Sequence, residues 1–381
     1  MEEDVLKRKA ISYILGGLFF LVLVSAQTAR QTEQGHKEAA TAQYDEQAEH
    51  ADHTAEEGFS PSDFVFDHIL DAYEWHILSY DDFHLSIPLP VIIYSDTKGL
   101  NVFMFNRFHH GHEDYKGFRF ESHGENKGNI VEILEDGSTA PPRLDLSFSK
   151  NVLAIMFSLI LLLWVFLSVA KAYSRRPDKA PTGMQNLMEP IILFIRDDIA
   201  RPSIGEHKYE KFMPFLLTVF FFIWFNNMIG LIPIFPGGAN VTGNISVTMV
   251  LALFTFVITT ISGNRNYWQH IFNMPGVPWW IKYPVPLVPV IELIGMMTKP
   301  FVLMIRLFAN ITAGHIIVLG FFSLIFIFGE MSVGLGLGVS VLSLAFTIFM
   351  TMLELLVALI QAYVFTLLSA IYFGMATEEH H

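Results

Sequence analysis

Long runs without a charged side chain constrain this chain more than any other feature. Residues 152–170 contain no Asp, Glu, Lys or Arg, and neither do residues 212–234 and 239–264. A helix needs roughly 20 mainly apolar residues to cross a hydrocarbon core about 30 Å thick. These runs therefore predict membrane-spanning helices. An ordinary soluble domain is excluded as well, because such domains are about 25% charged and this chain is 16% charged.

The C-terminal third extends this pattern into two much longer apolar segments. As one helix, residues 333–376 would run about 66 Å at ~1.5 Å per residue, so the helix must tilt steeply or kink. Residues 183–200 are amphipathic and predict a helix on the membrane surface. We expect an all-α polytopic membrane protein whose last two spans form a long tilted hairpin. The five predicted spans are residues 152–172, 212–234, 240–264, 288–329 and 333–376.

The net charge of −13 belongs to one part of the chain. Residues 27–150 contain 23 acidic and 9 basic side chains, a balance of −14, whereas residues 151–381 contain 11 and 12, a balance of +1. The acidic part argues against nucleic acid as a partner, because phosphate backbones attract basic surfaces. Basic residues follow the first span and place its end in the cytoplasm by the positive-inside rule: Lys171, Arg175, Arg176 and Lys179.

The region before the first span divides into three predicted parts. Residues 1–26 have a basic start, an apolar stretch and a small-residue exit, which is typical of a signal peptide cleaved near Ala26; an uncleaved anchor is the alternative. Residues 27–58 are acidic and His-rich and predict a disordered linker. Residues 59–150 predict a small α+β periplasmic domain. Its expected elements are a helix capped by Asp63 and running through Tyr73, and a hairpin of strands 84–94 and 100–105 around the turn 96–99.

A cluster of His and acidic side chains follows this hairpin, at His109, His110, His112, Glu113 and Asp114. Consecutive His residues on a loop lack the spaced ligands of a structural metal site, so we predict no metal there. The chain has no Cys and no phosphate-binding Gly-rich Lys loop. The sequence predicts no cofactor.

Ionisable residues within the apolar segments are costly and point to function. Glu292, Lys299 and Arg306 are spaced by seven and share one stripe of a helix, with Asn310 near it, whereas His315 lies on roughly the opposite face. In the last span Glu354 and Gln361 share a face.

An antiparallel hairpin brings together residues whose numbers have a constant sum. Arg306 with Gln361 gives 667, and His315 with Glu354 gives 669, so both polar pairs fall in one register. The turn is expected outside the cell. His315 and Glu354 then lie on the outer side of Arg306, and Glu292 lies on the inner side. Imidazole and carboxyl groups exchange protons near neutral pH, whereas Arg stays charged and would interrupt a continuous proton wire.

The run from Lys299 to His315, with its RLFANITAGH segment, resembles the signature of subunit a of the rotary F-type ATP synthase membrane sector. The last helix from Glu354 through Gln361, and the segments 227–233 and 242–248, are similar to further parts of that family. The resemblance covers residues 151–381. Residues 60–150 resemble, more loosely, the extended periplasmic N-terminus of Bacteroidetes-type members.

The resemblance implies a non-catalytic, proton-translocating stator subunit in the bacterial inner membrane. Arg306 would face the c-ring carboxylate, His315 and Glu354 would serve the periplasmic half-channel, and Glu292 the cytoplasmic one. Three polar residues would orient water or the arginine: Asn227, Asn310 and Gln361. Their alternative role is helix–helix hydrogen bonding. Some members carry an acid where this chain has Gly230. Implied partners are c-ring subunits, the peripheral-stalk subunit b, the remaining ATP synthase subunits, membrane lipid and protons; the His–Glu pair favours H⁺ over Na⁺.

Two other functions compete with this interpretation. A secondary transporter would usually show inverted repeats and more spans, and neither is visible here. A membrane-anchored periplasmic binding protein would use the His-rich segment and would have no need for Arg306, Glu354 or Gln361 inside the bilayer.

Overall fold

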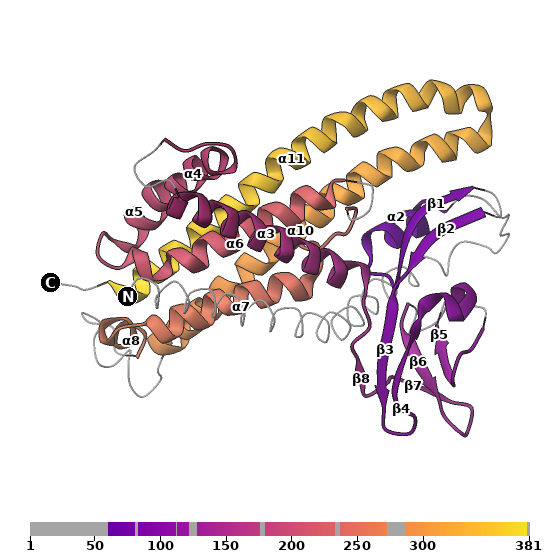
Figure 1. The fold of residues 1–381 in the computed structure, drawn as a ribbon, viewed down its shortest axis with the longest axis horizontal. Helices are drawn as coiled ribbons and strands as arrows, with labels where there is room; N and C mark the ends of the chain where they lie inside the picture. Colours follow the sequence, from indigo (N-terminus) through magenta and orange to yellow (C-terminus); the bar gives the residue numbers. More distant parts are fainter. Residues whose placement is uncertain are drawn as a thin grey trace.

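The computed structural model describes residues 60–80, 83–111, 113–121, 128–175, 180–232, 237–272 and 287–378. Several predicted features lie outside these residues: the signal peptide 1–26, the linker 27–58, and His112, Arg176 and Lys179. Figure 1 shows two parts, a β-rich N-terminal region and a bundle of long helices.

The N-terminal region consists of helix α2 (Pro61–Ile69) and short antiparallel strands in three small sheets. Strand β1 (Glu74–Tyr80) pairs with β2 (Phe83–Pro88). The other two sheets have the orders β4-β3-β8 and β5-β6-β7. Their strands are β3 (Pro90–Ser95), β4 (Gly99–Met104), β5 (Phe118–Phe120), β6 (Ile130–Ile133), β7 (Thr139–Ala140) and β8 (Leu144–Asp145); a 3-10 helix (Phe105–Gly111) follows β4.

Two local predictions for this region need correction. The helix begins at Pro61, so Asp63 lies inside it and does not cap it, and it ends at Ile69, before Tyr73. The predicted strand 84–94 is two strands, because the chain leaves one sheet at Leu89 and enters another at Pro90. Leu89 is buried and its backbone N–H donates to Tyr73. The sequence gives no local signal for such a change of sheet, because the strand-like run continues through both strands.

The predicted β-hairpin is confirmed in the sheet β4-β3-β8. Strands β3 and β4 pair antiparallel with Ser95 opposite Gly99, and Gly99 has a φ of +66° that suits glycine in a tight turn. Val91, Ile93 and Phe103 point to one side and are buried. They pack with aromatic side chains of the 3-10 helix and of the sheet β5-β6-β7. The inward-facing side chains of the hairpin thus form part of the core of this region.

A buried carboxylate joins the hairpin turn to the third sheet. The Glu132 side chain is 7% exposed and accepts hydrogen bonds from Ser95 and Thr97, with Lys98 Nζ 3.4 Å away. Lys98 also donates to the carbonyl oxygens of Gly117 and Ile133, each at 2.7 Å. Burial raises the pKa of Glu132, but these hydrogen bonds and the Lys98 charge together lower it below its ordinary value of 4.5.

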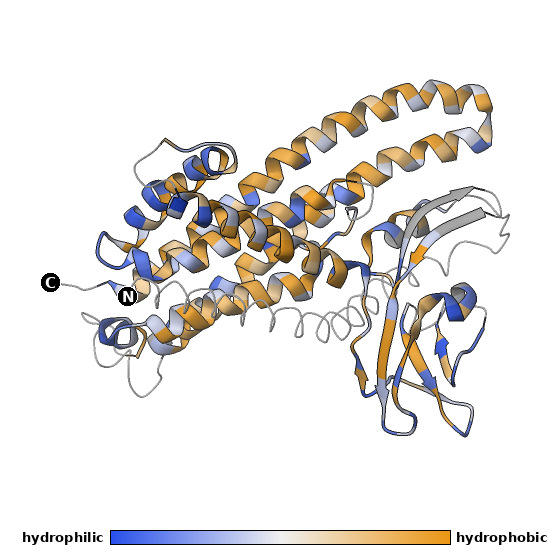
Figure 2. Ribbon diagram, in the orientation of Figure 1, coloured by the Kyte–Doolittle hydropathy of each residue, from blue (hydrophilic) through white to orange (hydrophobic). Residues whose placement is uncertain are grey.

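All five predicted spans are α-helices long and apolar enough to cross a membrane. They are α3 (Lys150–Arg175), α6 (Tyr209–Gly230), α7 (Ile245–Ser262), α10 (Leu287–Met331) and α11 (Val333–Thr377). Figure 2 shows hydrophobic residues along their whole length, with hydrophilic ones gathered in the shorter helices and the β-rich region. The apolar side chains on the outer faces of these helices are suited to contact with lipid.

Helices α10 and α11 are 45 residues each and run antiparallel. Near the turn at Ser332, Gly336 leaves no room for a Cβ because the Gly329 backbone lies 2.8 Å from where it would be. Further along, Ser343 donates a hydrogen bond to the Phe321 carbonyl. We call the end of the bundle with this turn the turn end, and the opposite end, where α11 stops, the C-terminal end.

The predicted helix 183–200 is present as two helical pieces, and a third continues beyond the predicted end. Helix α4 (Met184–Phe194) continues as a π-helical stretch (Ile195–Ala200) and then as α5 (Arg201–Ile204). Asp197 accepts hydrogen bonds from Arg196 and Arg201. The short helix α8 (Arg265–Phe272) lies at the same C-terminal end.

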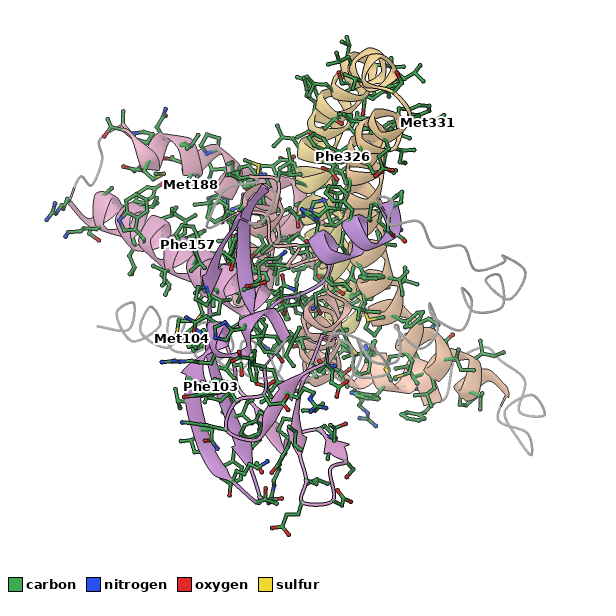
Figure 3. The ribbon with its side chains drawn as sticks, turned by 90° about the vertical axis from the view of Figure 1, so that its right-hand side faces the viewer. Phe103, Met104, Phe157, Met188, Phe326 and Met331 are labelled. Atoms are coloured by element: carbon green, nitrogen blue, oxygen red, sulfur yellow. The ribbon has the colours of Figure 1, made fainter. Side chains whose placement is uncertain are left out.

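The N-terminal region is joined to the bundle at the turn end. The Lys150 side chain donates to the His68 carbonyl at 3.2 Å, and the Asp71 carboxylate accepts from the Asn151 backbone N–H at 3.0 Å. Helix α2 also packs against α10, where the rings of Phe64 and Phe326 are 5.9 Å apart. Figure 3 shows Phe326 beside α2. The start of α3 and the outer part of α10 are thus held by the same short helix.

Substitution Lys98→Met should loosen the hairpin and the third sheet together. Loss of one partner of a fully buried pair costs about 3–5 kcal/mol, and the loss here should be smaller because Lys98 is 28% exposed. Hydrogen–deuterium exchange on the purified full chain should show faster exchange in β3, β4 and β6. Arg143→Met, which breaks the exposed Arg143–Asp96 pair, should change exchange little; equal effects of the two variants would contradict the assignment.

The same contact should make this region acid-sensitive. A carboxylate with a lowered folded pKa stabilises the fold above its unfolded pKa, and that stabilisation is lost as the pH falls through the folded pKa. Protection of β3 and β6 should therefore be constant from neutral pH to about 5 and decline below about 4. Glu132→Gln should weaken protection at neutral pH and flatten this acid dependence.

Candidate functional site

Two ionisable side chains meet inside the α10–α11 pair. His315 Nδ1 lies 3.1 Å from Glu354 Oε1, and the side chains are 19% and 10% exposed. The antiparallel register predicted this approach from the sum of their residue numbers. A carboxylate in an apolar surrounding needs such a partner, because burial of an unpaired charge is very costly. The pair can hold a shared proton and pass it on.

Gly314 makes room for the Glu354 carboxylate. A Cβ built on Gly314 would overlap Glu354 Oε1, with further Glu354 carbons 3.2 Å away. The absence of a side chain on α10 at this point therefore lets the acid of α11 lie flat against the helix and reach the next residue, His315. Gly320, one and a half turns further along α10, faces open space.

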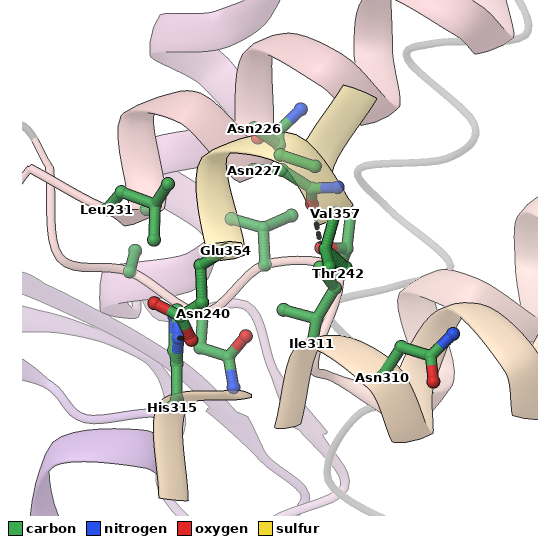
Figure 4. Close-up of a pocket in the computed structure, with 14 residues that line it drawn as sticks. Asn226, Asn227, Leu231, Asn240, Thr242, Asn310, Ile311, His315, Glu354 and Val357 are labelled. Carbon is green, nitrogen blue, oxygen red and sulfur yellow. Dashed lines mark hydrogen bonds and ion pairs between the residues drawn. The ribbon is translucent and has the colours of Figure 1, made fainter. Parts of the chain in front are cut away.

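A cavity with several polar side chains opens beside this pair, between α6, the loop that precedes α7, α10 and α11. Figure 4 shows the Asn240 amide beside Glu354 and His315, and Asn227 hydrogen-bonded to Thr242. The residues that line it include Asn226, Asn227, Asn240, Thr242, Asn310, His315 and Glu354. The cavity has room for a water molecule.

The amide groups around the cavity are only partly satisfied by protein atoms. Asn227 Oδ1 accepts a hydrogen bond from Thr242, but Asn227 Nδ2 has no partner among the described residues. Asn240 is 3% exposed, and within the same part of the chain neither its Nδ2 nor its Oδ1 has one. Buried polar groups are nearly always hydrogen-bonded, to ordered water where protein groups are missing. The unpaired atoms therefore mark this cavity as a site for water.

Asn240 was missed by the sequence interpretation, which quoted Thr242 only as part of a motif. Asn240 lies in the loop before α7, where nothing in the local pattern distinguishes it from a turn asparagine. Gly243 is the one indirect sign, since a Cβ there would overlap the Asn240 amide. Asn244 caps α7 by accepting from the Ser246 backbone N–H at 3.0 Å, which fixes the loop in this position.

Arg306 lies apart from the cavity, on the outer surface of α10. It is exposed, and its neighbours on that surface are apolar and exposed as well: Phe301 at 58%, Val302 at 47% and Ile305 at 37%. Gln361 of α11 is buried, with an exposed fraction of 6%. Of the predicted supporting residues, Asn227 and Asn310 line the cavity and Gln361 does not. A guanidinium on an apolar face is suited to meet a membrane-embedded acid of another chain.

A second polar group lies toward the C-terminal end of α10. Glu292 is partly exposed, with His270 Nδ1 of α8 4.0 Å from its Oε2. Lys299 Nζ lies over the Tyr372 ring, 5.5 Å from its centroid. A smaller cavity between α7, α8, α10 and α11 is lined by Thr255, Thr259, Tyr267, Lys299 and Tyr372, among others. Polar groups thus occur on both sides of Arg306 along one helix.

A bundle of membrane-length helices with a buried acid–imidazole pair, a water cavity and an arginine on an apolar face defines a class of membrane protein that handles ions. Comparison with known families identifies it further. Residues 152–374 match the family described as ATP synthase A chain, and the chain belongs to this family. Residues 64–148 match a family described as a domain of unknown function.

Curated relatives agree with this assignment. "ATP synthase subunit a 2" of Chlorobaculum tepidum is 45% identical over 273 residues, which cover 69% of this chain and 70% of the relative. "ATP synthase subunit a" of Chloroherpeton thalassium is 44% identical over 244 residues, 62% of this chain and 69% of the relative. The protein of that name from Myxococcus xanthus is 41% identical over 268 residues, 69% and 80% of the two chains.

Gly314→Ala should disturb the His315–Glu354 pair. The added methyl group overlaps the carboxylate, and overpacking of this kind costs about 1–3 kcal/mol. ATP-driven proton pumping by inverted membrane vesicles should fall roughly tenfold if that cost falls on the working geometry. Gly320→Ala on the same helix is the control and should pump normally. Normal pumping by both variants would show that the close approach at Gly314 is not needed.

Proposed function

We propose that Arg306, the His315–Glu354 pair and Glu292 carry proton flow through the membrane sector of the ATP synthase. By its family the chain is the proton-translocating stator subunit of an F-type enzyme. The observation that supports these roles best is the contact of His315 with Glu354 beside a water cavity lined by unpaired amides. The chain itself would be non-catalytic, and partner subunits would carry out the nucleotide chemistry.

The outer half-channel would be the cavity at the turn end. A proton enters through water held by Asn227 and Asn240, with Asn310 on the cavity wall, and reaches Glu354. The carboxylate and the His315 imidazole share it and release it to a deprotonated c-ring acid at the surface of α10. Because the buried amides of Asn240 and Asn227 keep polar atoms without a partner among the described residues, they can order water without holding a charge that would trap the proton.

Arg306 would separate the two half-channels. Its guanidinium stays protonated at any biological pH, so it cannot relay a proton, and it attracts a c-ring carboxylate in its ionised form. A ring acid that approaches Arg306 therefore gives up its proton on the inner side, where Glu292 would receive it. Gln361, buried on α11, would help to orient the arginine or the ring acid.

We further propose the orientation and the division of the chain. The signal peptide (1–26), the linker (27–58) and the domain at 59–150 would belong to the periplasmic side, and the membrane domain (151–381) would end in the cytoplasm of an inner membrane. The basic residues after the first span support this orientation. The partners would be the c-ring subunits, peripheral-stalk subunit b and the remaining subunits of the enzyme, with H⁺ as the coupling ion.

Arg306→Ala should abolish coupled proton pumping, because no fixed cation remains to separate the half-channels. The assay is ATP-driven acidification of inverted membrane vesicles, with assembly of the complex verified by its mass. Phe301→Ala, at an exposed apolar position of the same helix, is the matched control and should pump near the wild-type rate. Retained coupled pumping in the arginine variant would rule out the stator role.

Exchange of His315 and Glu354 should be milder than loss of either group. The double variant His315→Glu with Glu354→His keeps one imidazole and one carboxyl at the contact, whereas His315→Ala or Glu354→Ala removes a proton-transfer group, a loss of about 100-fold or more. ATP synthesis driven by a proton gradient should follow that order. If the exchange variant is as poor as the single ones, the pair does not act as a proton-sharing unit.

Asn240→Leu should block the outer half-channel while the fold is kept, because leucine has a similar volume but cannot order water. ATP synthesis should fall by about tenfold, the lower range for a disturbed proton transfer. Asn240→Ser, which keeps a polar group, should retain most of the rate. Equal rates in the two variants would show that the polarity of residue 240 is unimportant.

A further inference from the structure

His270 and Glu292 form a pair outside the residues that define the stator role. His270 Nδ1 is 4.0 Å from Glu292 Oε2, and the side chains are 48% and 34% exposed. The pair thus reaches solvent on one side and the α10 surface on the other. The separation is that of an ion pair and exceeds a direct hydrogen bond, so a water molecule or a small rotation of either side chain would complete the contact.

Helix α8 holds His270 in a defined place. Asn264 caps the helix by accepting from the Tyr267 backbone N–H at 2.8 Å, and its own N–H donates to the Ala376 carbonyl of α11 at 2.9 Å. Ile271, next to the histidine, is buried, with an exposed fraction of 4%. The imidazole is therefore presented by a helix anchored to the end of α11.

The position of the pair along α10 links it to the rest of the site. The second cavity begins one turn beyond Glu292, at Met296, and contains Lys299 and Tyr372. Arg306 follows 14 residues from Glu292, about 21 Å along the helix. His270 lies at the C-terminal end of the bundle. It is exposed to solvent and also faces Glu292 of α10.

We propose that His270 is the proton-exchange partner of Glu292 at the inner mouth, an inference that rests on the proposed function. During pumping, the imidazole takes a proton from bulk water, becomes imidazolium and transfers it to the Glu292 carboxylate, which becomes a carboxylic acid. During synthesis, Glu292 protonates the imidazole, which then releases the proton to water. Glu292 is the conducting group, and His270 acts through it.

The charges around the pair favour this exchange. Helix α10 contributes Glu292 and Lys299, α11 contributes Tyr372 and ends beside Glu378, and α8 itself carries Arg265. The cation of Lys299 repels a second positive charge deeper in the cavity, whereas Glu292 lies at ion-pair distance from His270 at the mouth. A proton is therefore collected at the mouth and is not held beyond it.

The test is His270→Gln in the whole ATP synthase complex, with pumping by inverted vesicles measured from pH 6 to pH 8.5 and normalised to assembled enzyme. We expect near wild-type pumping at pH 6 and a loss of about fivefold at the alkaline end, less than the ~100-fold typical of an enclosed proton-transfer group because water can partly substitute. Added imidazole should restore much of the alkaline rate. His207→Gln removes another exposed histidine of the C-terminal end and should leave the profile unchanged.

A second variant separates this inference from the proposed function. The double variant His270→Gln/Glu292→Gln should be no worse than Glu292→Gln alone if the histidine acts through the acid. An unchanged pH profile in His270→Gln, or a loss that imidazole does not restore, would overturn the role of His270. If Arg306→Ala still pumps, the stator role itself fails; if Arg306→Ala is inactive and His270→Gln is normal, only the present inference fails.

Discussion

The contact of His315 with Glu354 is the interaction on which the rest of the membrane part depends. A carboxyl group that is 10% exposed among apolar helices must be neutral, paired or hydrated. The close approach at Gly314 and the adjacent cavity supply the pairing and the hydration together. The arrangement of α6, α10, α11 and the loop before α7 around this point is thus the packing that makes a titratable acid tolerable inside the bundle.

The buried amides follow from the same constraint. Asn227 and Asn240 would be unfavourable in a dry core, because Asn227 Nδ2 and both polar atoms of the Asn240 amide have no partner among the described residues. They are reasonable only in a hydrated cavity, where a water molecule typically makes about three hydrogen bonds. An amide also carries no charge, so it can order water next to Glu354 without changing the electrostatic balance of the pair. Uncharged amides beside the titratable pair are therefore compatible with a cavity that conducts protons.

The features that could be predicted from the sequence are those that depend on the spacing of apolar residues and on composition. The five spans followed from uncharged runs, and the meeting of His315 with Glu354 followed from the register of two antiparallel helices. The β3–β4 hairpin was recognised from its turn and strand pattern. What depends on contacts between distant segments was not predictable: the break at Leu89 between two sheets, Asn240 in a loop, and His270 opposite Glu292. None of these has a local signal, since each residue acquires its role from a neighbour far away in the chain.

The length of α10 bears on why the proposed mechanism needs a second subunit. Glu292 and His315 are 23 residues apart on this helix, about 35 Å, and Arg306 lies between them with a permanent charge. The turn-end cavity stops at the His315–Glu354 pair, and the other cavity stops near Lys299. In the mechanism proposed above, a proton would leave one cavity and pass Arg306 on an acid of another subunit. The exposed apolar surface beside Arg306 would be where such an acid moves, and this geometry would couple the gradient to rotation.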